Sequence, residues 1–154
     1  MRIEYLADHP ELVETLARWH YDEWRDLIPE WSYERTRSEL ASHDARAAIP
    51  TTLLALDEAA PIGSASLVTE DLPEHRFLTP WVASVFVAPA WRGRGVGSAL
   101  VRRAVDVAGD LGVSKVYLAT PGQAAFYRKL GWREEPIPAA PGRPVMVMSI
   151  VPRR

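Results

Sequence analysis

Three glycines at alternate positions mark the stretch of this chain that is best suited to bind a phosphate group. They are Gly93, Gly95 and Gly97 in "VAPAWRGRGVGSALVRRA", and Arg92 and Arg94 stand beside them. Apolar residues before the glycines predict a strand, and the pattern after them predicts a helix. The first amides of a helix lack partners, carry partial positive charge and bind anions, and glycine lets a phosphate approach them closely. The stretch therefore predicts a pyrophosphate site, with a tight turn and two solvated arginines as the alternative.

Two well-known phosphate loops do not fit this spacing. A Walker loop ends in Gly-Lys-Ser/Thr, whereas Gly97 is followed by Ser98 and Ala99. The dinucleotide fingerprint Gly-x-Gly-x-x-Gly, read from Gly93 and Gly95, requires a third glycine where this chain has Ser98. A nucleotide-binding regulatory domain is therefore disfavoured.

A third pattern fits in two places. The segment Arg92-Gly93-Arg94-Gly95-Val96-Gly97 resembles the Arg/Gln-x-x-Gly-x-Gly/Ala signature of the GNAT superfamily of acyl-CoA-dependent N-acetyltransferases. Further along, "AAFYRKLGW" from Ala124 to Trp132 resembles the second motif of that family, with its Phe-Tyr pair and Leu-Gly-aromatic ending. The resemblance implies direct transfer of an acetyl group from acetyl-CoA to a primary amine, with no metal.

The resemblance also assigns the residues that hold acetyl-CoA. The backbone amides from Gly93 to Ser98 are expected to cradle its pyrophosphate. The main chain of Val85 and Val87 is expected to pair with the pantetheine arm as an added strand does. The complete expected set is Val85, Phe86, Val87, Arg92, Gly93, Arg94, Gly95, Val96, Gly97, Ser98, Gln123 and Phe126.

Tyr127 is the candidate catalytic residue. It matches the tyrosine that serves as general acid toward the CoA sulfur in many members of the family. The alternative is a core tyrosine on a short helix that packs Phe126 and Leu130. A positioned acid contributes about 100-fold to such a step, because a thiol with a pKa near 8.5 is a moderate leaving group.

The general base is open, because the strand "WVASVFV" before the glycine loop lacks the carboxylate that many family members carry there. The nearest candidates are Glu70, Asp71, Glu74 and His75 in the preceding loop, each with a solvated loop residue as the alternative. Ser84 on the strand can hold a water molecule and cannot be the base by itself.

The acceptor is an amine-bearing small molecule or peptide that the sequence does not identify. Trp24 and Trp31, near the first two helices, are candidates for its groove, since that region shapes substrate choice in the family; aromatic core is the alternative. The acidic loop before the strand hints at a cationic acceptor. A non-catalytic acyl-CoA-binding sensor or partner module is the second hypothesis; the absent strand carboxylate favours it and Tyr127 opposes it.

The elements that must position these residues follow from apolar periodicity and from proline and glycine. The predicted fold is α/β, a mixed sheet with helices on its faces, in the order β-α-α-β-β-β-α-β-α-β, with a parallel crossover from Val82 to Ala119. The first helix is expected to begin near Pro10, to show an apolar face interrupted by Glu23, and to end at Pro29. The other expected helices are Tyr33–Ser42 capped by Ser32, Gly97–Leu111 and Gln123–Leu130, and the expected strands are Ile3–Leu6, Thr51–Leu56, Ile62–Val68, Trp81–Val87, Lys115–Ala119 and Val145–Val151.

Composition narrows the class of protein. The 154 residues, 47% hydrophobic and 25% charged, predict one domain over residues 1–154. No cysteine is present, so thiolate chemistry and disulfides are excluded, and the four histidines lack metal-ligand spacing. A net charge of -2 argues against nucleic acid, and short apolar runs argue against a membrane span. We expect a cytoplasmic protein whose oligomeric state is open, a homodimer included.

Overall fold

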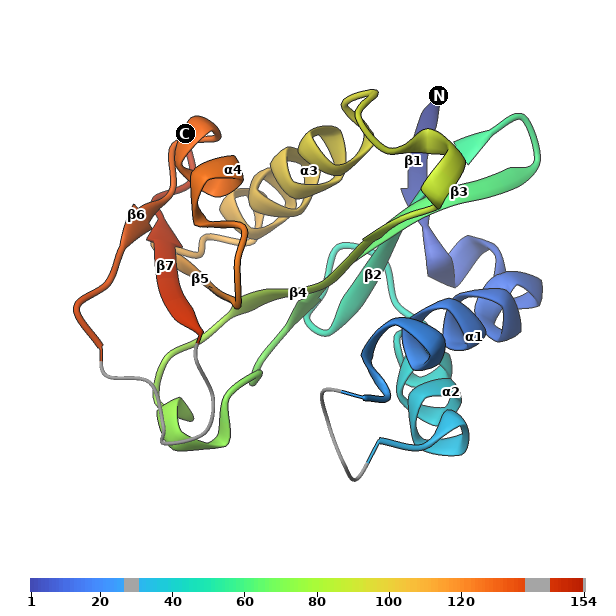
Figure 1. Ribbon diagram of the computed structural model, residues 1–154, viewed down its shortest axis with the longest axis horizontal. Coiled ribbons are helices and arrows are strands. Elements are labelled where there is room, and N and C mark those ends of the chain that lie inside the picture. Colours follow the sequence, from blue (N-terminus) through green and yellow to red (C-terminus); the bar gives the residue numbers. More distant parts are fainter. Residues whose placement is uncertain (27–30, 138–144, 154) are drawn as a thin grey trace.

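One seven-stranded sheet organises the fold, seen in a computed structural model that describes residues 1–26, 31–137 and 145–153 (Figure 1). The strand order is β1-β2-β3-β4-β5-β7-β6, and every neighbouring pair is antiparallel except β4 and β5. The strands are β1 (Arg2–Tyr5), β2 (Thr51–Asp57), β3 (Ala60–Val68), β4 (Trp81–Val87), β5 (Val116–Thr120), β6 (Arg133–Glu134) and β7 (Met146–Ile150). This confirms the mixed sheet and the parallel pairing across the crossover.

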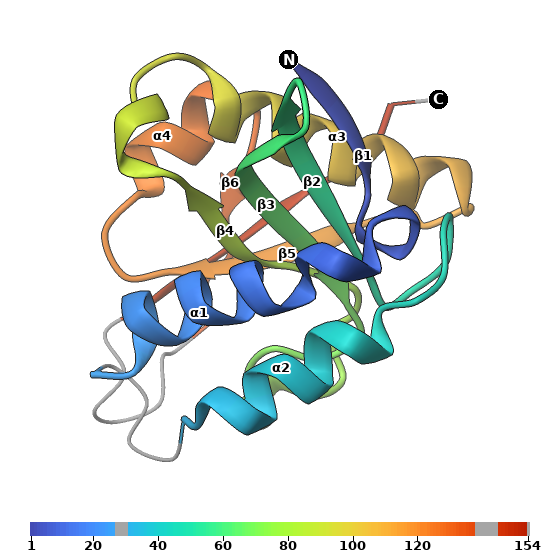
Figure 2. The same cartoon turned by 90° about the vertical axis from the view of Figure 1, so that its right-hand side faces the viewer.

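Helices cover both faces of the sheet. Figure 2 shows α1 (Val13–Trp24) and α2 (Tyr33–Ser42) side by side on one face, with α3 (Val96–Asp110) and α4 (Ala124–Lys129) on the other. Ser32 caps α2 as expected, because its side chain accepts a hydrogen bond of 3.1 Å from the amide of Arg35. The largest core cluster joins α3 to β2, β3 and β4, so the start of α3 is anchored firmly on the sheet.

The first helix differs from its prediction at both ends. Two 3-10 turns, Leu6–Asp8 and Pro10–Leu12, precede α1, which begins at Val13 and ends at Trp24. Leu27 and Pro29 lie outside the described residues. The buried stripe is Val13, Leu16, Ala17 and His20, while Glu23 is exposed. The predicted apolar face ran through Glu23, because His20 was not counted among the core residues.

One strand was missed. β6 contains only Arg133 and Glu134, which pair with Ser149 and Met148 of β7. Both of its residues are charged and exposed, so neither alternation nor hydrophobicity distinguishes them from a loop. The rest of the predicted order is confirmed.

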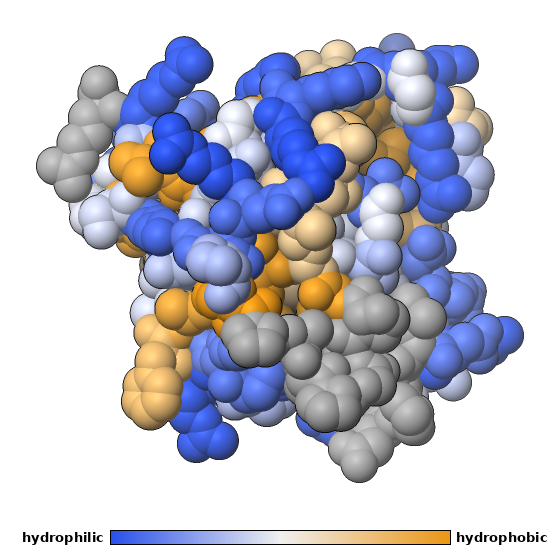
Figure 3. All heavy atoms as spheres, turned by 60° about the vertical axis from the view of Figure 1, so that its left-hand side comes forward, coloured by the Kyte–Doolittle hydropathy of each residue, from blue (hydrophilic) through white to orange (hydrophobic). Residues whose placement is uncertain are grey.

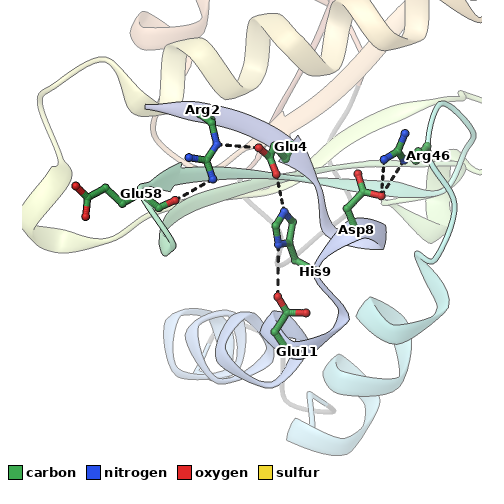
Figure 4. Close-up of polar contacts among 7 residues, drawn as sticks. All are labelled: Arg2, Glu4, Asp8, His9, Glu11, Arg46 and Glu58. Carbon is green, nitrogen blue, oxygen red and sulfur yellow. Dashed lines mark hydrogen bonds and ion pairs between the residues drawn. The ribbon is translucent and has the colours of Figure 1, made fainter.

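Ion pairs fasten β1 to the turn that leads into α1 (Figure 4). Glu4 accepts from Arg2 Nε at 2.8 Å and lies 2.6 Å from Nε2 of His9. This contact lowers the pKa of the Glu4 carboxyl and raises the pKa of His9. Nearby, Arg46 donates to Asp8 at 2.8 Å and ties the segment before β2 to the same turn. These pairs tie β1 and the segment before β2 to the turns that precede α1.

Close packing of β3 under α3 generates a first prediction. A Cβ on Gly63 would lie 2.9 Å from the carbonyl oxygen of Phe86, 3.0 Å from Leu100 and 3.1 Å from Val96. We expect Gly63→Ala to lower the free energy of unfolding by about 1–3 kcal/mol, because neither backbone nor buried side chains can move aside without strain. Chemical denaturation measures this. The control is Gly122→Ala, where a Cβ meets nothing within 4 Å; equal stability of the two variants would contradict the prediction.

Candidate functional site

The glycine loop leads directly into α3, whose first amides have no partner within the helix. Gly95 is the N-cap of α3, and the first bond of the helix pattern runs from Ala99 N to Gly95 O at 3.1 Å. The amides of Val96, Gly97 and Ser98 therefore precede the first helical hydrogen bond. Gly95, at the N-cap, is itself exposed. The loop has the geometry of an anion site at the start of a fifteen-residue helix.

Two of the glycines are required for backbone conformation. Gly93 and Gly95 have φ angles of 77° and 83°, which residues with a Cβ rarely adopt. A Cβ at either position meets nothing within 4 Å, so the protein itself does not fill the space above the loop. A Cβ on Gly97 would make ordinary van der Waals contacts, with Val87 at 3.5 Å and with Phe126 at 3.6 Å. Gly97 thus lies where α3, β4 and α4 meet.

The two arginines beside the glycines have different surroundings. Arg92 donates from Nε to the carbonyl of Val87 at 2.9 Å, and its guanidinium lies over the Phe86 ring. This bond braces the loop against the end of β4. Arg94 lies over Trp91, with 4.9 Å from guanidinium carbon to ring centroid, and is exposed. Arg94 therefore offers its charge to the solvent above the loop.

β4 carries a bulge and separates from β5. Ser64 pairs with Phe86 and Ser66 with Ala83, so one residue of β3 lies opposite two of β4, Ser84 and Val85. Ser84 adopts a φ of 53° at this bulge. β4 pairs with β5 only at Trp81 and Tyr117, and Figure 1 shows the two strands diverging. Beyond that pair, β5 does not cover the edge of β4, the edge on which Val85 and Val87 were expected to bind pantetheine.

Tyr127 lies buried on α4, with 8% of its surface exposed. Its ring contacts Phe126 and Trp132 edge to face, at centroid distances of 5.0 and 6.1 Å. Burial raises the pKa of the Tyr127 hydroxyl to about 12. The hydroxyl is therefore protonated at neutral pH, as a general acid must be. Gln123 precedes α4, and its backbone N–H donates to the hydroxyl of Thr120 at 2.9 Å.

A cavity of about 180 Å³ opens between α1, α2 and the strands β3 and β4. Four of the expected acceptor residues line it: Trp31, Glu70, Asp71 and Ser84. The remaining lining residues are His20, Thr36, Glu39, Leu40, His43, Ser66, Val68 and Ala83.

The other three expected acceptor residues lie away from this cavity. Trp24 packs against His20 and Phe86, with ring centroids 5.1 and 6.4 Å away, as the aromatic alternative has it. Glu74 and His75 belong to the 3-10 turn Pro73–His75 and are not among the cavity's lining residues.

Buried histidines form the floor of the cavity, and sequence reasoning missed them. His20 is 2% exposed and its Nε2 lies 2.9 Å from Ser64 Oγ. His43 is 4% exposed, and its Nδ1 lies 2.7 Å from Thr52 Oγ1, which in turn lies 2.8 Å from Ser66 Oγ. Burial lowers the pKa of His20 to about 4 and lowers that of His43, so both rings are neutral at pH 7. Serines at alternate positions of an otherwise apolar strand were the signal that could have revealed a polar face.

A wider cavity of about 780 Å³ lies where β5 ends and α4 begins. Its walls include Thr120, Gly122 and Ala125 on one side and Ile137 and Val147 on the other. Figure 3 looks onto this side of the molecule and shows apolar side chains gathered among charged ones. Neither of the two cavities includes the glycine loop, which is an open surface.

Within residues 1–26, 31–137 and 145–153, no group of three or more His, Asp or Glu side chains is placed to bind a metal ion. No helix in those residues has the length and hydrophobicity needed to cross a membrane.

Comparisons with known proteins agree on one family. The sequence model of the acetyltransferase (GNAT) family matches residues 13–132. A probable glucosamine 6-phosphate N-acetyltransferase from Oryza sativa subsp. japonica is 43% identical over 60 residues, which is 38% of this chain and spans only 36% of that relative.

Solved structures of similar fold include an aminoglycoside 6'-N-acetyltransferase complexed with coenzyme A. It has a TM-score of 0.78 and 16% identity, covering 100% of this chain and 98% of the other. A ribosomal-protein-alanine N-acetyltransferase from Brucella melitensis has a TM-score of 0.73 and 20% identity, covering 98% and 99%. At such identities the likeness shows the fold alone.

The buried His20 generates a prediction about pH. Its folded pKa of about 4 lies below the unfolded value of 6.5, so the unfolded chain takes up the proton first. Above about pH 6.5 His20 is neutral in both states and does not lower the free energy of unfolding. Between pH 6.5 and pH 4, protonation of His20 in the unfolded chain lowers that free energy by about 3 kcal/mol. Unfolding free energies of the wild type and His20→Gln across this range should show a shallower decline for the variant. Parallel curves would contradict the assignment.

Proposed function

The chain belongs to the GNAT acetyltransferase family and is an acyltransferase, and we propose that it moves an acetyl group from acetyl-CoA directly to a primary amine. The observation that carries this proposal is the continuity of one surface. The uncovered edge of β4 leads to the free amides at the start of α3, and Tyr127 lies on the adjoining helix.

Main-chain groups supply most of the proposed acetyl-CoA site. The amides of Val96, Gly97 and Ser98 would hold the pyrophosphate, with Arg94 as the nearby mobile charge. The pantetheine amides would pair with the edge of β4 at Val85 and beyond, where β5 has moved away. The space above Gly93 and Gly95 that no protein atom fills is compatible with a ligand as bulky as a diphosphate.

Transfer requires a neutral amine and a proton for the departing thiolate. The amine nitrogen forms a bond to the acetyl carbon, the bond from that carbon to sulfur breaks, and the nitrogen loses a proton. A lysine-like amine with a pKa near 10.4 is about 0.1% neutral at pH 7, so loss of the first proton is part of the barrier. Tyr127 would donate its proton toward the departing sulfur, and its raised pKa keeps that proton in place over the whole working range.

The acceptor is proposed to approach the bulge of β4 from the side of α1 and α2. Ser84 lines the cavity there and is followed at once by Val85 of the acetyl-CoA edge. The relatives act on amines of different kinds, among them an amino sugar phosphate and an aminoglycoside, by their names. The shared element in these names is the amine nitrogen, which supports a primary amine as the reacting group.

The glycine at the helix start provides a direct test of the pyrophosphate site. We expect Gly95→Ala to weaken CoA binding at least about tenfold, because a left-handed residue with a Cβ costs about 1–2 kcal/mol and shifts the amides of the loop. Isothermal calorimetry with CoA measures this. Gly112→Ala is the matched control, since Gly112 has the same φ of 83° and nothing within 4 Å of a Cβ, at the other end of α3. Equal loss of CoA affinity in both variants would overturn the assignment.

Removing the hydroxyl of Tyr127 tests the general acid. We expect Tyr127→Phe to lower kcat by about 10- to 100-fold and to leave the affinity for CoA nearly unchanged, because Phe preserves the packing against Phe126 and Trp132. Initial rates of CoA release with an accepted amine supply the measurement. Tyr5→Phe on β1, at the far edge of the sheet, is the control. An undiminished kcat would remove Tyr127 from the mechanism.

A further inference from the structure

The cavity between α1, α2 and β4 combines an acidic rim with an uncharged polar floor. At the rim, Glu39 and Glu70 are exposed, and none of the described residues that line the cavity is Lys or Arg. The floor contains the buried side chains of His20 and His43. The acidic rim attracts a positively charged group to the entrance of the cavity. The uncharged floor offers hydrogen bonds deeper inside.

Glu39 of α2 lines the cavity at this rim. The surroundings of its carboxyl desolvate it and raise its pKa, while Arg35 on the same helix acts in the opposite direction to a smaller extent. A carboxylate that is partly desolvated gains more from a cationic partner than one in bulk water does. An ammonium group beside Glu39 would supply that partner.

The indole of Trp31 points to a second feature of the ligand. Trp31 lines the same cavity, and its buried Nε1 has no hydrogen-bond partner among the residues that the structure describes. A buried donor without an acceptor is costly, and native proteins rarely leave one unsatisfied. An ammonium group cannot accept this bond, because nitrogen in that state has no lone pair. The ligand therefore needs an oxygen as well as a nitrogen.

The size of the cavity limits the molecule. About 180 Å³ corresponds to roughly six water molecules at about 30 Å³ each. This volume suits a short chain or a small ring, and it is below the usual range for sites that enclose larger ligands.

The geometry points to this cavity as the binding site for a compact primary amine that carries a hydroxyl group and no anionic group. Resting on the proposed function, the amine is the acetyl acceptor, since the cavity reaches β4 at Ala83 and Ser84, next to Val85. Glu39 attracts the ammonium form, and the hydroxyl oxygen accepts from Trp31 Nε1. A peptide N-terminus with its bulky chain and an amino acid with its carboxylate are both disfavoured.

Three probes of similar length separate these features: aminopentanol, hexylamine and aminopentanoate. They share a primary amine and differ in carrying a hydroxyl, a methyl or a carboxylate at the other end. Calorimetry on the CoA complex measures binding, and CoA release from acetyl-CoA measures acetylation. We expect the wild type to favour aminopentanol over hexylamine by about threefold to tenfold, the value of one hydrogen bond, and over aminopentanoate by more.

Two variants assign the preference to residues. Trp31→Phe should abolish the preference for aminopentanol over hexylamine. Glu39→Gln should weaken both amines by about tenfold and reduce the discrimination against aminopentanoate. Glu34→Gln is the matched control, because Glu34 is an exposed glutamate of α2 that does not line the cavity.

The two measurements keep this inference separate from the proposed function. Aminopentanol binding that depends on Glu39 and Trp31, without CoA release from any amine, would support the cavity assignment and overturn the acetyl transfer. Acetylation in which aminopentanoate or hexylamine equals aminopentanol, or in which neither variant changes the preference, would overturn the cavity assignment and leave the transferase intact. Absence of aminopentanol binding at millimolar concentration would also overturn it.

Discussion

The extra residue in β4 is the constraint on which the rest of the site depends. Because Ser84 and Val85 face a single residue of β3, the strand twists locally and leaves β5 after one pair, Trp81 with Tyr117. A regular parallel pairing along the whole of β4 would satisfy its edge with protein and leave no place for a ligand backbone. The divergence is stable because each half of the sheet has its own contacts. On one side α3 packs on β2, β3 and β4, and on the other side β5 pairs with β7. The same bulge places Ser84 in the cavity on the α1 and α2 side.

The layer under α1 and α2 is polar, which is unusual for a core. It is explained by the hydrogen bonds of its buried histidines. Two neutral histidines replace apolar residues there, and each has a hydroxyl partner, Ser64 for His20 and Thr52 for His43. A buried imidazole with a hydrogen bond costs far less than an unpaired one, so the helices can pack on a polar floor. The contrast with Trp31 is informative, because its donor has been left unpaired within the same cavity.

Local patterns in the sequence predicted most of the fold, and they carry the proposal for the acyl half of the site. The glycines, the Phe-Tyr pair and the Ser32 cap each depend on a few neighbouring residues, and each lies in the element where it was predicted. The start of the first helix was predicted wrongly, since α1 begins at Val13. The polar floor depends on contacts between distant parts of the chain: His20 and Ser64 are 44 residues apart. The bulge likewise depends on how β3 and β4 pair, which no single strand reveals. For this reason Trp31, Glu70, Asp71 and Ser84 could be proposed singly, while Glu39 and the two histidines emerged only with the structure.

The two halves of the site use different chemistry, and this explains how one fold accommodates many acceptors. In the proposed site, the acyl half would depend on the main chain: the amides at the start of α3 and the edge of β4, which require a few glycines and a bulge but few particular side chains. The proposed acceptor half would depend on side chains from α1, α2 and the loop after β3, and these can change without disturbing the sheet. Chains that share only 16–20% identity can therefore keep a TM-score of 0.73–0.78 with this one while their names record different amine substrates. On this argument, the acceptor of each member is to be sought in the charges and unpaired donors of that second half, and in this chain those are Glu39 and Trp31.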